Sequence, residues 1–527
     1  MTSPLAETPA HTTEPGAGRE VELKLECRPL DLPTLAGHPL LKRRKGAGTK
    51  TLVSTYFDTA DRDLRRAGLT LRVRRDGKRF IQTVKAGEGA AGLFDRPEWE
   101  SDVAGEAPDP AAFADTPVRA LLDEARHGEL RAVFRTAVSR IHRPVKQGRS
   151  AIAATLDEGR VETEAGDAVL CELELELVSG DPADLFALAR ALSETVPLRL
   201  GALSKSERGY RLLDGRGGPS KAVPLSLPED ASAADAFRAV ALSCLRHLRL
   251  NEAVFLAARD PEALHQIRVA LRRLRSAFSL FAPILAADPE ARARADAIKQ
   301  VTEPFGRARN LDVFLETTLP AEIARRPEEP GLPELSARIA AERDAAHAEV
   351  VAILDSPDWA RRILDLLAWV ETGPWLAPGG PPERDGSARA FAADTLDRFR
   401  KRVKKRGKDL AKLDPEARHR VRIAAKKLRY GADFFVSLFP EKAARKRHKA
   451  FAAALSDLQD HLGALNDLAT AHDVLGGLAE GEGEGAPGAA LFAAGLTAAD
   501  NEAGADALIE AAADAYDALV DATPFWR

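Results

Sequence analysis

Charged and apolar residues alternate in two short runs of the first half of the chain, Glu20-Val21-Glu22-Leu23-Lys24-Leu25 and Glu172-Leu173-Glu174-Leu175-Glu176-Leu177. Successive side chains of a β-strand point to opposite faces, so each run puts its charges on one face and its apolar residues on the other. If the charged faces are covered, their carboxylates must be paired with cations or must hold an ion. Clustered carboxylates of this kind are typical ligands of a hard divalent cation.

Basic residues in neighbouring segments predict what such a site would bind. Cations occur at strand spacing in Leu71-Arg72-Val73-Arg74 and in Gln82-Thr83-Val84-Lys85, and Arg96 precedes Glu98 and Glu100. An interior that holds both signs of charge favours a highly anionic substrate, bridged to the protein carboxylates by a metal ion. Each run alone is more typical of the solvated face of an ordinary antiparallel sheet, and only their conjunction favours a charged interior.

Further motifs follow in a characteristic order around these two runs. They are Tyr56-Phe57-Asp58-Thr59, Leu71-Arg72-Val73-Arg74, Lys85, Arg96-Pro97-Glu98-Trp99-Glu100, Leu156-Asp157-Glu158-Gly159 and Ser204-Lys205-Ser206-Glu207-Arg208-Gly209-Tyr210. With the two charged runs, this order resembles the CYTH domain of the triphosphate tunnel metalloenzymes over residues 19–214. The resemblance implies a closed eight-stranded antiparallel β-barrel whose lumen binds a triphosphate and one or two Mg²⁺ or Mn²⁺ ions.

The resemblance also implies a role for each charged residue of the predicted lumen. The catalytic set is Glu20, Glu22, Lys24 and Lys85. The metal ligands are Glu20, Glu22, Asp157, Glu172, Glu174 and Glu176, and which of the last three bind the metal stays open. The cations for the phosphates are Arg72, Arg74, Arg96, Arg140 and Lys205, with Arg65 as a weaker candidate. The implied reaction is in-line attack of water on a terminal phosphoryl group.

Length and charge distribution predict more than one domain. The chain has 527 residues, enough for two or three cores, and a net charge of −4. Between Arg398 and Arg429 it has 15 Lys and Arg residues against three acidic residues, which favours a polyanionic partner. We expect a disordered tail at 1–18, the barrel at 19–214, a linker at 215–227 and a helical domain at 228–520.

Three widely spaced cysteines, Cys27, Cys171 and Cys244, form no metal-binding pattern, and their odd number argues against a disulfide framework. The N-terminal residues lack the features of a signal peptide, and no apolar stretch is long enough to cross a membrane. The sequence therefore predicts a cytoplasmic protein without a membrane partner.

The helical half contains a repeated pattern of cations. Its members are His265, Arg268, Arg272 and Arg275 in the first copy, and His419, Arg422, Lys426 and Arg429 in the second. Steps of three, four and three residues place each set on one face of a helix, where like charges repel unless an anion neutralises them. A solvated, salt-bridged helix surface is the commoner explanation of such a stripe, but acidic partners are scarce beside the second one.

A second pair of segments repeats downstream, Phe305-Gly306-Arg307-Ala308-Arg309-Asn310 and Leu462-Gly463-Ala464-Leu465-Asn466-Asp467. The paired pattern resembles the CHAD domain, a helical module of two repeats, here at about 228–371 and 388–520. That resemblance implies binding of inorganic polyphosphate, although Asn310 stands where the family is expected to have Asp. Nucleic acid is a less favoured partner, because the helical half has few aromatic residues for stacking and no recognisable motif.

Together these patterns predict an α+β multidomain protein, with an antiparallel β-barrel followed by an all-α helical bundle of two repeats. The predicted enzyme is a metal-dependent inorganic triphosphatase whose helical domain binds polyphosphate and associates with polyphosphate granules. The alternatives are a non-catalytic polyphosphate-binding scaffold, or a triphosphatase or cyclase that acts on thiamine triphosphate or ATP. The preferred metal and the oligomeric state do not follow from the sequence.

Overall fold

The computed structural model describes residues 18–42, 48–87, 91–122, 129–215, 217–480, 492–497 and 505–527. The predicted N-terminal tail lies outside these ranges except for Gly18. The chain divides into two compact units, residues 1–218 with 356–372, and residues 219–355 with 373–527. Helix α14 (Pro357–Thr372) thus belongs to the first unit, although its sequence neighbours belong to the second.

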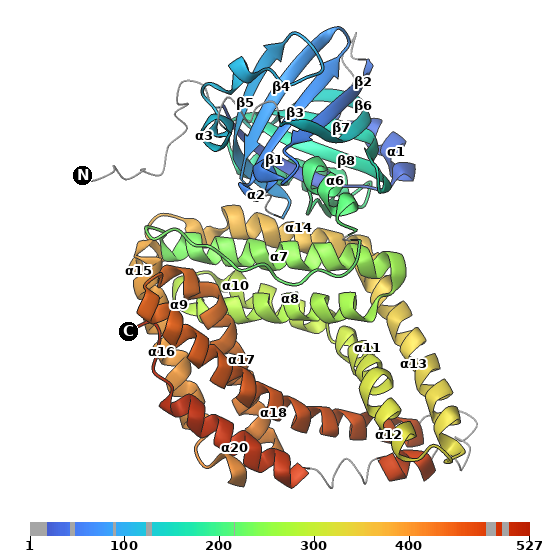
Figure 1. Ribbon diagram of the computed structural model, residues 1–527, viewed down its shortest axis with the longest axis vertical. Coiled ribbons are helices and arrows are strands. Elements are labelled where there is room, and N and C mark those ends of the chain that lie inside the picture. The colour runs from blue at the N-terminus through green and yellow to red at the C-terminus, as the bar shows by residue number, and fades with distance from the viewer. Residues whose placement is uncertain are drawn as a thin grey trace. The chain divides into compact units, whose positions relative to one another are not determined.

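The first unit is built on a closed antiparallel barrel of eight strands (Figure 1). Its strands are β1 (Gly18–Glu26), β2 (Thr49–Asp58), β3 (Leu69–Asp76), β4 (Arg79–Ala86), β5 (Leu93–Val103), β6 (Arg131–Gln147), β7 (Ser150–Thr163) and β8 (Gly166–Ser179). They pair in the order β5-β4-β3-β2-β6-β7-β8-β1, and pairing of β1 with β5 closes the ring. A ninth short strand, β9 (Arg199–Leu200), pairs with β1. This confirms the predicted barrel.

Strands β1 and β8 lie side by side, so that the two alternating runs of the sequence share one face. Glu22 pairs with Glu176, Lys24 with Glu174 and Glu26 with Glu172 in the antiparallel register. The intervening leucines are fully buried on the other face. Helix α5 (Pro182–Ser193) contacts β1, β6 and β8 and buries its own Leu185, Phe186, Leu188 and Leu192. Burial of apolar surface outside the barrel therefore holds the charges inside it.

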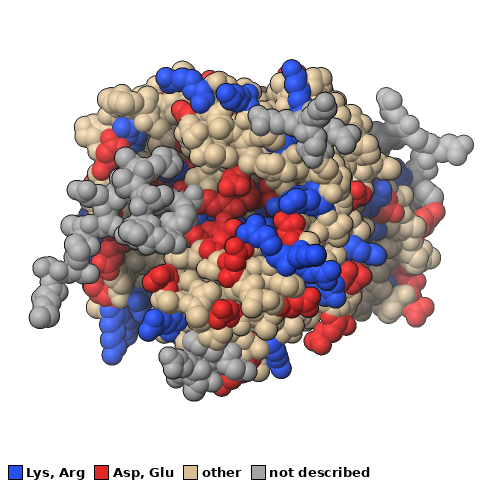
Figure 2. Space-filling model, turned by 90° about the horizontal axis from the view of Figure 1, so that it is seen from above, with Lys and Arg blue, Asp and Glu red and all other residues tan. Residues whose placement is uncertain are grey.

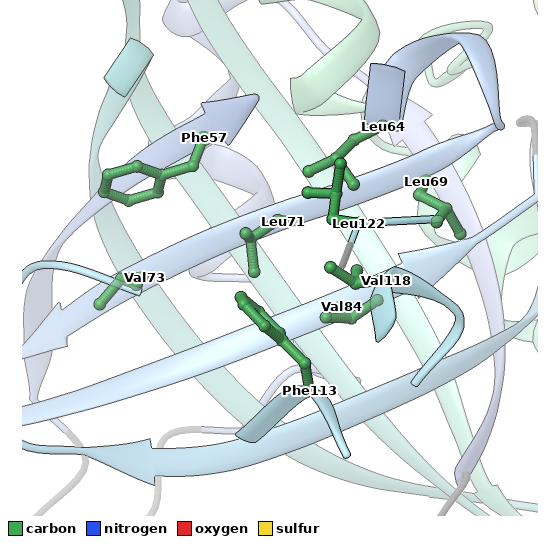
Figure 3. Packing of buried hydrophobic residues seen from close by; sticks show 9 residues of the cluster. All are labelled: Phe57, Leu64, Leu69, Leu71, Val73, Val84, Phe113, Val118 and Leu122. Carbon is green, nitrogen blue, oxygen red and sulfur yellow. The ribbon is translucent and has the colours of Figure 1, made fainter. Parts of the chain in front are cut away.

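The outer face of β2, β3 and β4 has an apolar cover of its own (Figure 3). Short segments lie over these strands, among them α2 (Asp63–Arg66), the 3₁₀ turn Pro110–Phe113 and α3 (Pro117–Leu121). The cluster consists of Phe57, Leu64, Leu69, Leu71, Val73, Val84, Phe113, Val118 and Leu122. Residues of β3 thus contribute Leu71 and Val73 to this core, while Arg72 between them points the other way, into the barrel.

The second unit is helical. Its longer helices are α7 (Ala233–Ala258), α8 (Pro261–Leu280), α10 (Pro289–Val301), α11 (Pro304–Val313), α13 (Gly331–Leu354), α16 (Ala388–Arg406), α17 (Pro415–Phe435), α18 (Lys442–Glu480) and α20 (Ala505–Asp521). The short ones are α9 (Ala282–Leu285), α12 (Leu319–Arg325) and α15 (Pro382–Asp385). The first unit also contains α1 (Leu32–Ala36) and α6 (Lys205–Leu213). None of the described helices is long and apolar enough to cross a membrane.

The helices that carry the two predicted cation stripes begin in the same way. Asp260 caps α8 and Asp414 caps α17, and each aspartate accepts a hydrogen bond from a backbone N–H three residues further on. A proline follows each cap at the first helical position, where its missing N–H costs no helical hydrogen bond. Helices α8 and α17 contact each other within the unit.

Candidate functional site

The barrel encloses a cavity of about 200 Å³. All its lining side chains are polar or charged, namely Glu20, Glu22, Lys24, Tyr56, Thr70, Arg72, Arg74, Thr83, Lys85, Arg96, Glu98, Glu100, Arg140, Thr155, Glu174, Glu176, Ser204, Lys205 and Ser206. On the face seen in Figure 2, acidic side chains gather in a recess with basic side chains beside it. Such a lining suits a small, highly charged ligand without an apolar part.

Three carboxylates, those of Asp157, Glu172 and Glu174, form an inner acidic group whose oxygens lie within 4.8 Å of one another. Lys24 Nζ lies 3.1 Å from Glu172 and also bonds Glu174. Lys205 Nζ lies 2.8 Å from Asp157 and 2.7 Å from Glu174 and also contacts Glu172. The inner group thus has buried ammonium groups as close partners.

Arg140 is the third cation of the inner group. Its guanidinium donates two hydrogen bonds to Asp157, at 2.7 Å and 2.5 Å, and a third to Glu174 at 3.1 Å. A paired geometry of this kind is the strongest form of an arginine–carboxylate contact. Burial alone would raise the pKa of Asp157, but Lys205 and Arg140 outweigh it and lower that pKa.

The same balance acts on Lys24. Burial would lower the pKa of this ammonium group, but the carboxylates of Glu172, Glu174 and Glu22 outweigh burial and raise the pKa well above its usual value. Lys24 is therefore charged at neutral pH although its side chain is only 3% exposed.

A second acidic group, the outer group, consists of Glu20, Glu22, Glu98 and Glu176. Lys85 Nζ lies 2.6 Å from Glu20 and 3.1 Å from Glu98, and Arg96 Nε lies 3.7 Å from Glu20. Burial and the carboxylate of Glu174 raise the pKa of Glu22. Partial burial, together with Glu20, Glu22 and Glu98, raises the pKa of Glu176 to about 7. The outer group thus carries more negative charge than its own cations neutralise.

Two arginines line the cavity with weaker compensation. Arg72 lies 3.8 Å from Glu98 and 3.9 Å from Glu100, near the limit of an ion pair. Arg74 donates a long hydrogen bond of 3.5 Å to Ser54 Oγ, and no described carboxylate lies within ion-pair distance of it. Burial, with the charges of Arg72 and Arg140, lowers the pKa of Arg74 to about 10. An anion in the cavity would relieve this repulsion.

The residues present fit a hard divalent cation. All candidate ligand atoms are carboxylate oxygens, the atoms that Mg²⁺ and Mn²⁺ prefer. The buried oxygen Glu172 Oε2 accepts no hydrogen bond from the described residues. In the outer group, burial and the neighbouring carboxylates raise the pKa values of Glu22 and Glu176, and a bound cation would favour their charged forms. The barrel therefore offers an inner and an outer set of metal ligands.

The structure brings together the barrel residues that the sequence nominated. Apart from Arg65, all of them line the cavity or, in the case of Asp157 and Glu172, pair with a residue that does. Arg65 does not line the cavity, because it pairs with Asp214 at 2.7 Å and stacks on the ring of Tyr210. Glu98 and Glu100 also line the cavity, although they were not among the site residues predicted from the sequence. Their spacing of two residues after Arg96 would have predicted that all three share one face of the strand.

The helical unit contains a basic cluster, formed by Arg268 and Arg272 of α8 and by Arg422 and Lys426 of α17. Burial and the charges of Arg272, Arg309 and Arg422 lower the pKa of Arg268 to about 10. Burial, Arg422 and Arg272 lower the pKa of Lys426 to about 7. Charges from both repeats thus lower the pKa of each of these two residues, and Arg272 and Lys426 line one cavity. These four cations of the two stripes therefore lie close together and form one site.

Backbone and amide oxygens orient two members of the basic cluster. Arg268 donates to the carbonyl of Gly306 at 2.8 Å, and Arg422 donates to Asn466 Oδ1 at 2.8 Å. Both acceptors belong to the repeated downstream segments of the sequence. Asn310 and Asp467, which the repeat equates, line the same small cavity of about 30 Å³. The charge of Asp467 raises the pKa of Arg422, against the larger effect of burial.

The other stripe residues have different surroundings. Arg275 lines a cavity of about 790 Å³ with Arg272, Lys426 and Lys427. Arg429 donates to Gln459 of α18 at 3.3 Å, and His419 is exposed at the first turn of α17. Burial and the charges of Arg309 and Arg272 lower the pKa of His265 to about 4, so His265 is neutral in the free protein. Sequence reasoning missed Arg309, although it lies in the downstream repeat segment.

Comparison with known proteins supports both halves. The sequence model of the CYTH domain matches residues 18–210, and that of the CHAD domain matches residues 239–476. An inorganic triphosphatase of Haemophilus influenzae is 28% identical over 205 residues, which are 37% of this chain and 55% of the relative. The chain thus spans about half the length of that curated relative.

Solved structures include the CHAD domain of the plant Ricinus communis. It is 35% identical, with a TM-score of 0.50, and the match covers 58% of this chain and 97% of that one. PptA of Streptomyces chartreusis is 18% identical with a TM-score of 0.42, and the match covers 56% of this chain and 100% of that one. The latter similarity is too low to support a functional argument.

Proposed function

This chain belongs to the CYTH and CHAD families, and from that premise we propose that its barrel hydrolyses inorganic triphosphate to pyrophosphate and phosphate with the help of Mg²⁺ or Mn²⁺. The proposal is supported by the cavity, in which lysine and arginine side chains face two groups of carboxylates. The curated relative named an inorganic triphosphatase agrees with this reaction.

The observation that favours inorganic triphosphate is the lining of the cavity. No aliphatic side chain lines it among the described residues, and Tyr56 is its one aromatic. Its volume of about 200 Å³ is below the range of about 300–1,000 Å³ that is usual for sites of drug-sized ligands. A nucleoside or a thiamine group would find little space there and only the ring of Tyr56 for apolar contact, so ATP and thiamine triphosphate are less suitable substrates.

The side chains divide the chemistry among themselves. Arg72, Arg74 and Lys85 would bind phosphate oxygens and stabilise the charge that develops on the leaving pyrophosphate. Carboxylates of the inner and outer groups would hold the cation, which would neutralise negative charge on the substrate. A carboxylate of the outer group, such as Glu22 or Glu176, would orient the attacking water in line with the scissile bond. The reaction needs no serine or cysteine nucleophile.

The test is release of phosphate from inorganic triphosphate by the purified protein, with Mg²⁺, with Mn²⁺ or with a chelator. We expect metal-dependent turnover that Glu22→Ala lowers by at least about 100-fold, because a buried ligand and orienting group is lost. Glu158→Gln is the matched control, because that carboxylate is exposed on the outside of β7. Equal turnover in Glu22→Ala would refute the assignment. If the protein hydrolyses ATP or thiamine triphosphate but not inorganic triphosphate, the assigned substrate is wrong.

For the helical unit we propose binding of inorganic polyphosphate at the basic cluster. Support comes from the convergence of cations from both repeats and from the depressed pKa values of Arg268 and Lys426, which an anion would restore. A flexible phosphate chain can follow such a cluster without any readout of bases. We further propose a cytoplasmic location, in keeping with the cysteine usage, and association with polyphosphate granules through this binding.

A further inference from the structure

Two cysteines lie opposite each other on adjacent strands of the barrel, Cys27 directly after the end of β1 and Cys171 within β8. The antiparallel register of β1 and β8, in which Glu26 faces Glu172, continues by one position to Cys27 and Cys171. The backbone N–H of Cys27 donates to the carbonyl of Cys171 at 3.3 Å, and the two Sγ atoms are 3.4 Å apart. Directly opposed residues have Cβ atoms about 4.5–5.5 Å apart, and a disulfide needs about 3.5–4.5 Å. A small approach of the segment after β1 toward β8 is therefore enough for a bond.

Both thiols lie on the outer side of the barrel. Glu172, which follows Cys171, points into the lumen, so Cys171 points outward by the alternation of the strand. Both cysteines are half-buried, whereas Cys244 of α7 is buried. In the ladder of β7 with β8, the residue opposite Cys171 is Glu158, which is exposed. A small oxidant can thus reach the pair from solvent.

The two thiols are in direct contact, since their Sγ atoms are 3.4 Å apart. Whichever thiol is oxidised first is therefore within reach of the other, which is held in position to complete the reaction.

We propose that Cys27 and Cys171 form a reversible intrachain disulfide when the protein meets a hydroperoxide. The thiolate of one of the two cysteines attacks one oxygen of hydrogen peroxide, the S–O bond forms as the O–O bond breaks, and the released hydroxide takes up a proton to give water. The sulfur of the other cysteine then attacks this sulfenic acid, the S–S bond forms, and a second water leaves. The two thiols lose two electrons, and one hydrogen peroxide becomes two molecules of water.

The bond would tie β1 to β8 next to Glu26 and Glu172. It would close a segment between residues separated by 144 positions, which restricts the unfolded chain strongly. We expect oxidation to raise the melting temperature of the barrel unit by roughly 5–10 °C. A reductant such as dithiothreitol should reverse the rise.

The experiment treats the full chain with hydrogen peroxide, alkylates the remaining thiols and maps the linked peptides by mass spectrometry without reduction. We expect one linkage, Cys27 to Cys171, in the monomeric chain, with Cys244 alkylated only after denaturation. Cys244→Ser is the matched control and should form the same linkage with the same rise in melting temperature. Cys27→Ser should leave a sulfenic acid on Cys171, which a dimedone probe detects, and should show no rise.

Several results would overturn the proposal. Linkages to Cys244 or between chains would contradict the pairing. Two unmodified thiols in excess peroxide, or oxidation of Cys171 to a sulfinic acid in the wild-type chain without any linkage to Cys27, would show that the pair does not close. The peptide map of the wild-type chain decides the question even if a serine variant folds poorly. The result does not depend on whether the barrel hydrolyses triphosphate.

Discussion

Individual charges in the lumen differ in how well they are neutralised. Each carboxylate of the inner group lies in direct contact with Lys24, Lys205 or Arg140. In the outer group, Lys85 and Lys24 pair with Glu20, Glu98 and Glu22, but no described cation lies within ion-pair distance of Glu176. Partial burial and the neighbouring carboxylates raise the pKa of Glu176 to about 7. At the residue scale, a bound cation would therefore be stabilised most by the outer group, and a bound anion would be stabilised most beside Arg74. A triphosphate with its metal ion supplies both charges at once.

In the helical unit, Lys426 of the basic cluster changes its charge near neutral pH. Burial and the neighbouring arginines lower its pKa to about 7, and an anion would favour its charged form. Polyphosphate binding should therefore take up a proton, and affinity should fall as pH rises through about 7, by at most about tenfold per pH unit. Without a bound anion, Lys426 is mostly neutral in the folded protein but charged in the unfolded chain between about pH 7 and the usual pKa of 10.5. The unfolded chain thus binds more protons in this range, so the free energy of unfolding should rise with pH there.

Titration calorimetry with polyphosphate from about pH 6 to about pH 9, in buffers of different ionisation enthalpy, measures this proton uptake. Lys426→Arg is the matched variant, because it keeps the charge over the whole range. We expect it to flatten the pH dependence. An unchanged slope in this variant would assign the proton to another group.

At the scale of elements, close approach of two long strands shapes the barrel wall. Gly159 of β7 lies opposite Val138 of β6, and a Cβ at this glycine would lie 2.0 Å from the carbonyl oxygen of Ala137 and 2.7 Å from Val138 Cα. Both atoms belong to the backbone and cannot rotate away. Asp157 is two residues away on the same strand, so this contact also positions a carboxylate of the inner group.

Gly159→Ala should push β6 and β7 apart and lower the free energy of unfolding by about 2–3 kcal/mol. Urea unfolding, followed by the far-ultraviolet signal of the strands, checks the value. Gly48→Ala is the control, because a Cβ at Gly48 has no neighbour within 4 Å. The free energy of unfolding of this variant should differ from that of the wild type by no more than about 0.5 kcal/mol, as is usual for surface substitutions. Equal midpoints for the two variants would show that the wall can relax around the added methyl group.

At the scale of the whole molecule, the two units carry separate sites. The idea that the helical unit brings the enzyme to polyphosphate while the barrel cleaves short chains can be tested without truncation. Deleting residues 228–527 would also remove α14 from the barrel unit, where Asp365 pairs with Arg190 at 2.5 Å. Substitutions inside the basic cluster leave that packing intact.

The double substitution Arg272→Gln with Lys426→Met should lower polyphosphate affinity by about 100-fold, because two cations that face the anion are lost. Triphosphate hydrolysis should stay unchanged, since neither residue belongs to the barrel unit. Neither side chain has an ion-pair partner among the described residues, so folding should be preserved. Lys401→Met with Lys405→Met removes the same charge from exposed positions of α16 and should bind nearly as well as the wild type. Equal losses in both variants would indicate diffuse attraction instead of a site.

Local periodicity determined much of this protein from the sequence. The alternation in β1 and β8 indicated which side chains enter the lumen, because the face of a strand residue depends only on its parity. The repeated spacing in α8 and α17 likewise indicated two cation stripes, and the ordered motifs indicated both families.

Only the tertiary structure decided which of these residues become neighbours, because strand register and helix packing depend on contacts far apart in the chain. It paired Lys205 with Asp157, added Glu98 and Glu100 to the cavity and turned Arg65 away to Asp214. It also brought Arg309 to the basic cluster and left His419 exposed. Cys27 and Cys171, which the sequence separates widely, meet because β1 and β8 close the barrel in one particular register.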